Sequence, residues 1–327
     1  MATAAVRLQR RTVGIRRALA PIAEARGMAR TMLWVGTGLT LVFVLLAIFA
    51  PLLAPYGFDQ YQAHGHRFAQ LAHPSHSHIF GTTVQSTDVL SRIVWGAQTE
   101  LEVVGLALAF GLVIGVPLGL VSGYFGGALD RGTVLFMDAM FAFPPLLLAI
   151  VIAFLLGGSV NSGVLVAALA ITITYVPQYF RVVRNHVISV REEPYVEAAR
   201  ALGAKPFTIL RRYVFFNVVQ NVPVIATLNA ADAVLTLTAL GFLGYGVQPS
   251  QGAEWGYDVS RAVSDAASGI WWTGLFPGLA IVLLVTGLTL LGEGLNETIN
   301  PVLRRRTIAR VDFGSPSLER PSEILEP

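Results

Sequence analysis

Long apolar runs are the feature that most limits what this 327-residue chain can fold into. A helix needs about 20 apolar residues to cross the ~30 Å hydrocarbon layer of a bilayer. Six segments reach or approach that length, namely 33–50, 101–121, 133–156, 164–180, 218–243 and 272–291. Only 13% of the residues are charged, whereas a soluble domain carries about 25%. We therefore predict an all-α integral membrane protein with about six transmembrane helices.

The basic residues predict how these helices are oriented. With the N-terminus in the cytoplasm, Arg67, Arg92 and Arg261 are the only outer members of the 23 Lys and Arg residues. Such an excess of basic residues on the inner side is typical of multi-pass membrane proteins. The predicted organisation is a cytoplasmic tail (1–32), a first transmembrane helix (33–50), an extracytoplasmic loop (51–97), a transmembrane core (98–300) with an inner loop (181–216) and an outer loop (245–271), and a cytoplasmic tail (301–327).

The inner loop contains a short helical segment with clear start and stop signals. Pro194 suits a first helical turn, because its missing N–H has no partner there in any case. The residues from Tyr195 to Leu202 favour helix, Gly203 is a natural stop in the left-handed conformation, and Pro206 can begin a second helix. Alanines leave the exposed side of the first helix flat enough to dock into a groove of a partner.

This loop carries a family resemblance. The run EAARALG at Glu197–Gly203 resembles the EAA loop of permeases in binding-protein-dependent ATP-binding-cassette (ABC) importers. Other stretches resemble the dipeptide, oligopeptide and nickel branch of that family, in particular the subunit with a long outer loop after span one. These stretches are 78–105, 119–130, 141–144, 240–249, 271–281 and 290–301. The likeness covers roughly residues 30 to 305, so the transmembrane core is predicted to be a permease core.

The resemblance implies a role for the loop and a set of partners. In this family the loop is a coupling helix that sits in a cleft of the ATPase subunit, which makes Glu197, Ala198, Ala199, Arg200, Leu202 and Gly203 the candidate coupling residues. The implied complex, in a bacterial cytoplasmic membrane, adds a second permease subunit, two ATPases and an extracytoplasmic substrate-binding protein. Nucleic acid is not among the expected partners.

The chain itself is not expected to be an enzyme or to bind a cofactor. A P-loop ends in Gly-Lys-Ser/Thr, which holds phosphate and magnesium, but the single lysine, Lys205, lies between Ala204 and Pro206. ATP and magnesium are therefore assigned to the partner subunits. The expected cargo is a dipeptide or short oligopeptide, with nickel or another small solute as the alternative.

Two rival functions and several departures from the family pattern stay open at this point. The chain is alternatively a secondary transporter coupled to protons through Asp138 or Asp232, or a scaffold without transport activity. The family usually has Asp, Gly-Arg, Arg, Pro and Glu where this chain has Thr83, Ser86-Thr87, Leu135, Phe216 and Leu237. Because polar groups that line the path are among those altered, the pattern does not fix the substrate.

Four acidic residues are candidates for the translocation path, because ionisable groups inside a membrane are costly and often functional. Asp138 either faces the path or pairs with Arg131, which lies two helical turns earlier. Asp232, in the fifth span, is a candidate to face the translocation cavity. Glu100 and Glu102 open the second span, where they either meet a cationic substrate group or stay solvated at the interface.

Histidines and glycines give two weaker signals. Five histidines gather in the outer loop, at positions 64, 66, 73, 76 and 78, and His73, His76 and His78 are the candidate metal ligands. No carboxylate lies among them, so no specific metal site is predicted. Gly111, Gly115 and Gly119 permit close helix approach, either to the second permease subunit or within this chain.

Overall fold

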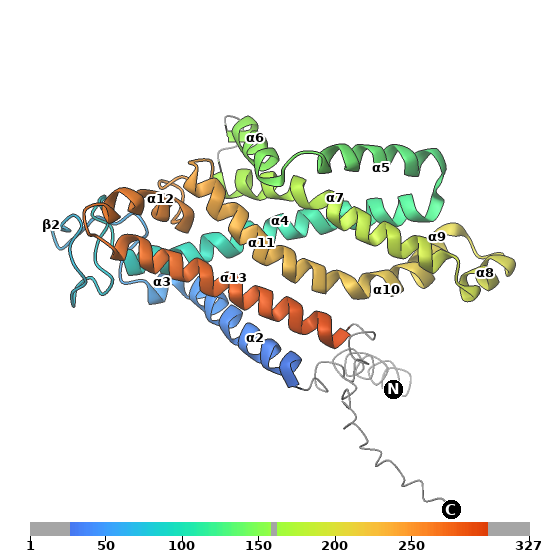
Figure 1. Cartoon of the computed structure of the whole chain (residues 1–327), viewed down its shortest axis with the longest axis horizontal. Helices are drawn as coiled ribbons and strands as arrows, with labels where there is room; N and C mark the ends of the chain where they lie inside the picture. Colours follow the sequence, from blue (N-terminus) through green and yellow to red (C-terminus); the bar gives the residue numbers. More distant parts are fainter. Residues whose placement is uncertain (1–26, 158–161, 300–327) are drawn as a thin grey trace, which may run out of the picture.

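Five long helices form the body of the protein in a computed structural model, which describes residues 27–157 and 162–299. Each is long and apolar enough to cross a membrane, as predicted. They are α2 (Gly27–Ile48), α4 (Val89–Phe125), α7 (Gly163–Arg191), α11 (Val222–Phe242) and α13 (Trp272–Ile299). They run along the long axis of the molecule (Figure 1). The predicted all-α membrane fold is therefore confirmed.

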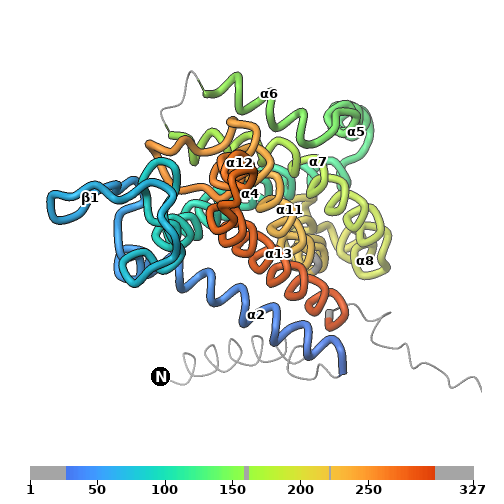
Figure 2. Tube along the Cα trace, turned by 60° about the vertical axis from the view of Figure 1, so that its left-hand side comes forward, coloured from blue at the N-terminus to red at the C-terminus, as the bar shows by residue number. Residues whose placement is uncertain are grey.

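The third predicted span, 133–156, is not a single straight helix. Helix α5 (Gly127–Phe141) and helix α6 (Pro145–Gly157) meet at an angle of 93°, and Figure 2 shows α6 running away from the end of α5. The bend falls at Pro144 and Pro145, where proline removes an N–H donor and restricts the residue before it. The pair is thus a broken span or a re-entrant element.

Two helices extend beyond the spans predicted for them. Helix α4 begins at Val89, because the carboxylate of Asp88 caps it by accepting a hydrogen bond from the backbone N–H of Ser91 at 2.8 Å. Helix α7 continues through Arg191, since nothing breaks it before Pro194. The expected outer loop 51–97 therefore ends in helix, and the expected inner loop 181–216 begins in helix.

Close packing of α4 against α7 forms the centre of the bundle. A Cβ atom added at Gly115 would lie 2.9 Å from the carbonyl oxygen of Val176, and one added at Gly119 would lie 2.7 Å from that of Phe180. Only glycine lets the two backbones approach this closely. The contact made by Gly115 and Gly119 is therefore internal, which decides between the two alternatives left open by the sequence.

One end of the bundle, called here the α8 end, is a small helical assembly. It holds α8 (Pro194–Ala201), α9 (Pro206–Ile209), a π-helical turn (Leu210–Val214), α10 (Phe215–Val218) and a 3₁₀ turn (Val219–Asn221). Buried side chains join α8 and α9 to the end of α7, among them Val183, Val187, Val196 and Ile209. This end of the bundle has its own apolar core.

The opposite end, called here the α12 end, is covered by loops and short elements (Figure 1). It holds α3 (Ala50–Leu53), an antiparallel hairpin of β1 (Gln62–Ala63) and β2 (His66–Arg67), and α12 (Trp255–Ala266). Trp255 is fully buried, and its indole N–H donates to the carbonyl of Ile93 at 3.2 Å. The α12 end thus folds down onto helix α4.

Candidate functional site

The α8 segment, residues 194–209, is the part of the chain that the sequence singled out. Helix α8 begins at Pro194 and is followed by a turn in which Gly203 has φ +80°. The N–H of Gly203 donates to the carbonyl of Arg200 at 2.9 Å, and that of Ala204 donates to the carbonyl of Ala199 at 3.0 Å. The predicted left-handed conformation of Gly203 is confirmed.

The two faces of the α8 segment differ sharply in exposure. Val196 and Ala199 are buried against α7, α9 and the π-helical turn. Leu202 is 89% exposed and Phe207 is 72% exposed, on either side of the Gly203 turn. Large apolar side chains grouped in the open are typical of an interaction site.

The charged residues of α8 leave its outer surface available. Glu197 is exposed and makes no ion pair or side-chain hydrogen bond within the described part of the chain. The guanidinium of Arg200 lies 5.8 Å from the ring centroid of Tyr124, on α4. Ala198 is exposed as well.

Polar contacts join helices α4, α5 and α7 at this end of the bundle. Asp130 of α5 accepts two hydrogen bonds of 2.6 Å from the guanidinium of Arg184, on α7, and one from the hydroxyl of Ser122, on α4. Arg191 donates to the carbonyl of Gly123 at 2.9 Å. These contacts tie α4, α5 and α7 to one another beside the α8 segment.

Asp138 has a different partner from the one considered in the sequence. Its carboxylate pairs with Arg181 of α7 at 2.7 Å, and both side chains are about half exposed. The pairing with Arg131 is wrong, because seven residues separate the two along one helix by about 10 Å, whereas α7 lies alongside. The guanidinium of Arg181 also lies 4.2 Å from the ring centroid of Phe141.

Asp232 lies exposed on α11, ten residues from either end of that helix. The hydroxyl of Tyr175, on α7, donates to its carboxylate at 2.8 Å. Exposure of Asp232 in the isolated chain is compatible with the predicted place in a cavity. Its role stays a prediction.

The two glutamates at the start of the second span differ in exposure. Glu102 is exposed, but Glu100 is completely buried beneath α12. Glu254, also buried, caps α12 by accepting hydrogen bonds of 2.8 Å from the backbone N–H groups of Gly256 and Tyr257. Solvation of Glu100, or direct contact with a substrate, is therefore wrong in this structure, because the chain folds back over it. Burial raises the pKa of Glu254 well above its ordinary value of 4.5.

A buried ion pair that the sequence did not indicate fastens α12 to α4. The guanidinium of Arg92 contacts the carboxylate of Asp258 at 2.7 to 3.0 Å, and both residues are buried. Arg92 also donates to the carbonyl of Phe58 at 3.1 Å. Because 166 residues separate the partners, no local spacing or motif in the sequence predicts the pair.

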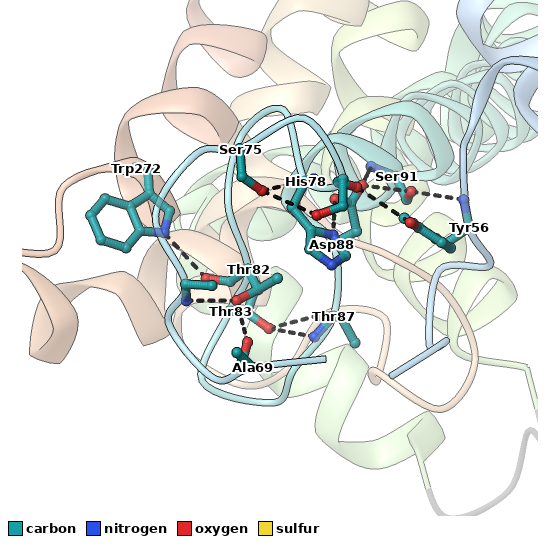
Figure 3. Close-up of polar contacts among 12 residues, drawn as sticks. Tyr56, Ala69, Ser75, His78, Thr82, Thr83, Thr87, Asp88, Ser91 and Trp272 are labelled. Carbon is teal, nitrogen blue, oxygen red and sulfur yellow. Dashed lines mark hydrogen bonds and ion pairs between the residues drawn. The ribbon is translucent and has the colours of Figure 1, made fainter. Parts of the chain in front are cut away.

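The chain that leads into α4 is held by a second polar cluster, drawn in Figure 3. His78 pairs with the buried carboxylate of Asp88 at 2.8 Å. The hydroxyls of Thr83 and Thr87 lie 2.6 Å apart, so two of the positions that depart from the family pattern hold each other through a neutral hydrogen bond. These contacts fix the chain that enters α4.

The histidines do not assemble into a metal site in the part of the chain that the structure describes. No group of three metal-ligating side chains occurs among those residues. The ring of His73 packs against Trp272 at 4.5 Å between centroids, and His78 is engaged by Asp88. The candidate set of His73, His76 and His78 therefore has no structural support.

Comparison with known proteins identifies the family of this chain. Residues 115–305 match the family described as "Binding-protein-dependent transport system inner membrane component". The chain belongs to this family of importer permeases. Residues 28–74 match the "N-terminal TM domain of oligopeptide transport permease C". The family match contains the α8 segment and most of the bundle.

Individual importer permeases agree over most of their length. The dipeptide transport system permease protein DppC of Alkalihalophilus pseudofirmus is 39% identical over 265 residues, which are 80% of this chain and 83% of that protein. The glutathione transport system permease protein GsiD of Pectobacterium atrosepticum is 32% identical over 280 residues, which are 85% of this chain and 90% of that protein. The GsiD protein of Escherichia coli is 33% identical over 264 residues, which are 81% of this chain and 84% of that protein.

A solved structure supports the fold of this importer permease. A chain of the MetNI methionine ABC transporter, solved in inward-facing conformations, superposes with a TM-score of 0.51 at 21% identity. It covers 64% of the present chain and 96% of its own. The chain is thus a multi-pass permease of the peptide-type ABC importer family, and the secondary transporter and scaffold alternatives fall away.

Proposed function

We propose that this chain is one of two permease subunits of an ATP-driven importer of dipeptides or short oligopeptides, and that it forms half of the translocation pathway. The relatives named for dipeptide and glutathione transport support this cargo, since glutathione is itself a short peptide. No cluster of metal-ligating side chains favours nickel among the described residues.

The proposed orientation places the α8 end in the cytoplasm and the α12 end outside. It rests on the positive-inside distribution of arginine and gives both termini to the cytoplasm. Two ATPase subunits, which bind ATP and magnesium, would then contact the α8 segment. An extracytoplasmic binding protein would deliver peptide at the α12 end, and the second permease subunit would complete the pathway.

The mechanism follows from the way the α8 segment is built. Leu202 and Phe207 project from a turn that Gly203 closes, while the opposite side of α8 is packed onto α7. Closure of the ATPases would push this turn, and the contacts of Asp130 and Arg191 would carry the push into α4, α5 and α7. The cavity between the permeases would change its open side, a shift between two packed arrangements. The exposed apolar turn is the observation that carries the proposal.

Co-purification and uptake test this function. The two ATPases, tagged and purified in mild detergent, should carry this chain with them, and a co-eluting binding protein should contain a short peptide. Proteoliposomes with the complete complex should take up a labelled dipeptide only when ATP and magnesium are supplied. Uptake of nickel but no peptide would overturn the cargo, and uptake without ATPase subunits would overturn the mechanism.

A further inference from the structure

One face of α7 carries a line of polar side chains through the bundle. Thr174, Gln178, Arg181 and Asn185 are spaced four, three and four residues apart, which places them on one side of a helix. All four are partly or fully exposed in this chain. Polar and charged groups in transmembrane helices face protein or water rather than lipid. This line, called here the α7 stripe, therefore belongs on a polar surface.

Two acidic residues flank the α7 stripe from the helices on either side. On the α5 side, Asp138 pairs with Arg181, and a hollow opens beside them that Asn185 also lines. On the α11 side, Tyr175, one helical turn from Gln178, donates its hydroxyl hydrogen to Asp232. The α7 stripe therefore has one acidic residue on each side, Asp138 on α5 and Asp232 on α11.

The charges beside the α7 stripe are not evenly compensated. Asp138 has Arg181 and Asp130 has Arg184. Asp232 has no cationic partner within residues 27–157 and 162–299. Its position, ten residues from either end of α11, lies about 15 Å from both ends and so near the middle of a bilayer. A carboxylate at that depth calls for a cation or water.

The carboxylate of Asp232 is held in one direction but keeps one oxygen available for a hydrogen bond. Tyr175 is 4% exposed and donates to Oδ2, which fixes the direction of the carboxylate. None of the hydrogen bonds between described residues uses Oδ1 of Asp232. A primary ammonium group, which is compact and has three N–H donors, matches an exposed carboxylate with a free oxygen.

We propose that Asp232 receives the protonated amino terminus of the peptide as it moves along the α7 stripe. This inference rests on the proposed function, because it requires that the cargo be a peptide with a free amino group. The peptide's ammonium would exchange water for Asp232 at mid-membrane and continue inward past Arg181 and Asn185. Asp232 would thereby favour cargo with a positive leading end.

The test compares two dipeptides in proteoliposomes that hold the complete importer, one with a free amino group and one that is N-acetylated. Each is supplied with enough binding protein loaded to saturation, so that delivery is equal. We expect the wild-type complex to favour the free dipeptide, and Asp232→Asn to reduce this preference at least tenfold. Tyr175→Phe, which removes only the orienting hydroxyl, should reduce it about threefold, and Asp232→Glu should retain most of it.

A second measurement uses the absence of cysteine from the chain. A single cysteine at Gln178→Cys should react with water-soluble methanethiosulfonates, and faster with a cationic reagent than with an anionic one. Adding Asp232→Asn should lower that ratio at least fivefold. A cysteine at Val282→Cys, on the exposed side of α13, should stay unreactive as the lipid-facing control.

The outcomes separate the two levels of the proposal. A wild-type complex that transports no peptide overturns the proposed function and this inference together. Peptide uptake with an unchanged preference in Asp232→Asn overturns the inference alone. An unchanged reagent ratio at position 178 also overturns it, because Asp232 would then present no negative charge to the α7 stripe. This result needs no transport activity from the variant.

Discussion

The two ends of the bundle use charged and apolar side chains in opposite ways. The α8 end has an apolar core of its own and leaves Leu202 and Phe207 in the open. The α12 end buries its charges, with Arg92 against Asp258 and Glu254 at a helix cap. The first arrangement suits a surface that another protein grips. The second makes a cap that holds itself together and is costly to open.

The largest expected effect is a loss of stability when the buried ion pair of the α12 end is broken. Arg92→Ala leaves Asp258 buried without its counter-charge, and losing one partner of a buried pair costs about 3–5 kcal/mol. The thermal unfolding midpoint of the detergent-purified complex should fall accordingly. The matched control, Arg92→Met with Asp258→Leu, removes both charges and should be closer to wild type. A single variant as stable as the wild type would show that the pair does not hold the cap.

The next largest effect is expected at the exposed α8 end, where a substitution should weaken binding to the ATPases without lowering the stability of the fold. Leu202→Asp, at a side chain that is 89% exposed, should change the free energy of unfolding by less than about 0.5 kcal/mol. It should weaken binding to the ATPases by about 2 kcal/mol or more if Leu202 is an anchor. Quantitative pull-down measures this, with Tyr61→Asp at the α12 end as control. Full ATPase binding by Leu202→Asp would remove the α8 segment from the interface.

A smaller effect, on ATP-dependent uptake, is expected from a substitution in the Gly203 turn next to Leu202. Gly203→Val forces a β-branched residue into φ +80°, at a cost of about 1–2 kcal/mol for a left-handed residue. ATP-dependent uptake should fall about tenfold in complexes that still assemble. Gly203→Asn, which tolerates this conformation, should retain most of the activity. Normal uptake by the valine variant would mean that the turn does not transmit force.

The smallest effect is a pH dependence confined to the α12 end. Because the folded protein raises the pKa of Glu254, the native state binds more protons than the unfolded chain between pH 4.5 and that raised pKa. Stability should therefore decline as pH rises through this window. The slope cannot exceed about 1.4 kcal/mol per pH unit for one group. Glu254→Gln should flatten the decline in unfolding midpoint. An equal slope in that variant would place the titrating group elsewhere.

Local patterns predicted much of the molecule because their physics is local. Apolar length located the membrane helices, and the signals at Pro194 and Gly203 predicted the α8 helix and its turn. The bend between α5 and α6 was missed, although Pro144 and Pro145 are visible in the sequence, because the apolar run continues through them.

Long-range pairing could not be predicted in the same way. The partners of Arg92 and Asp138 lie on other elements, and only the packing of α12 on α4 and of α7 on α5 brings them together. Glu100 was misplaced for the same reason, since a span that opens at a surface gives no sign that another segment folds over it.

A site-specific cross-link at the α8 end tests the central claim most directly. Because the chain has no cysteine, Leu202→Cys supplies a single thiol that a short bifunctional reagent can join to the ATPase subunits in the assembled importer. The account predicts an efficient cross-link to an ATPase, with a yield that changes when ATP is added. A thiol that reacts only from the extracytoplasmic side, or that never joins an ATPase, would contradict it.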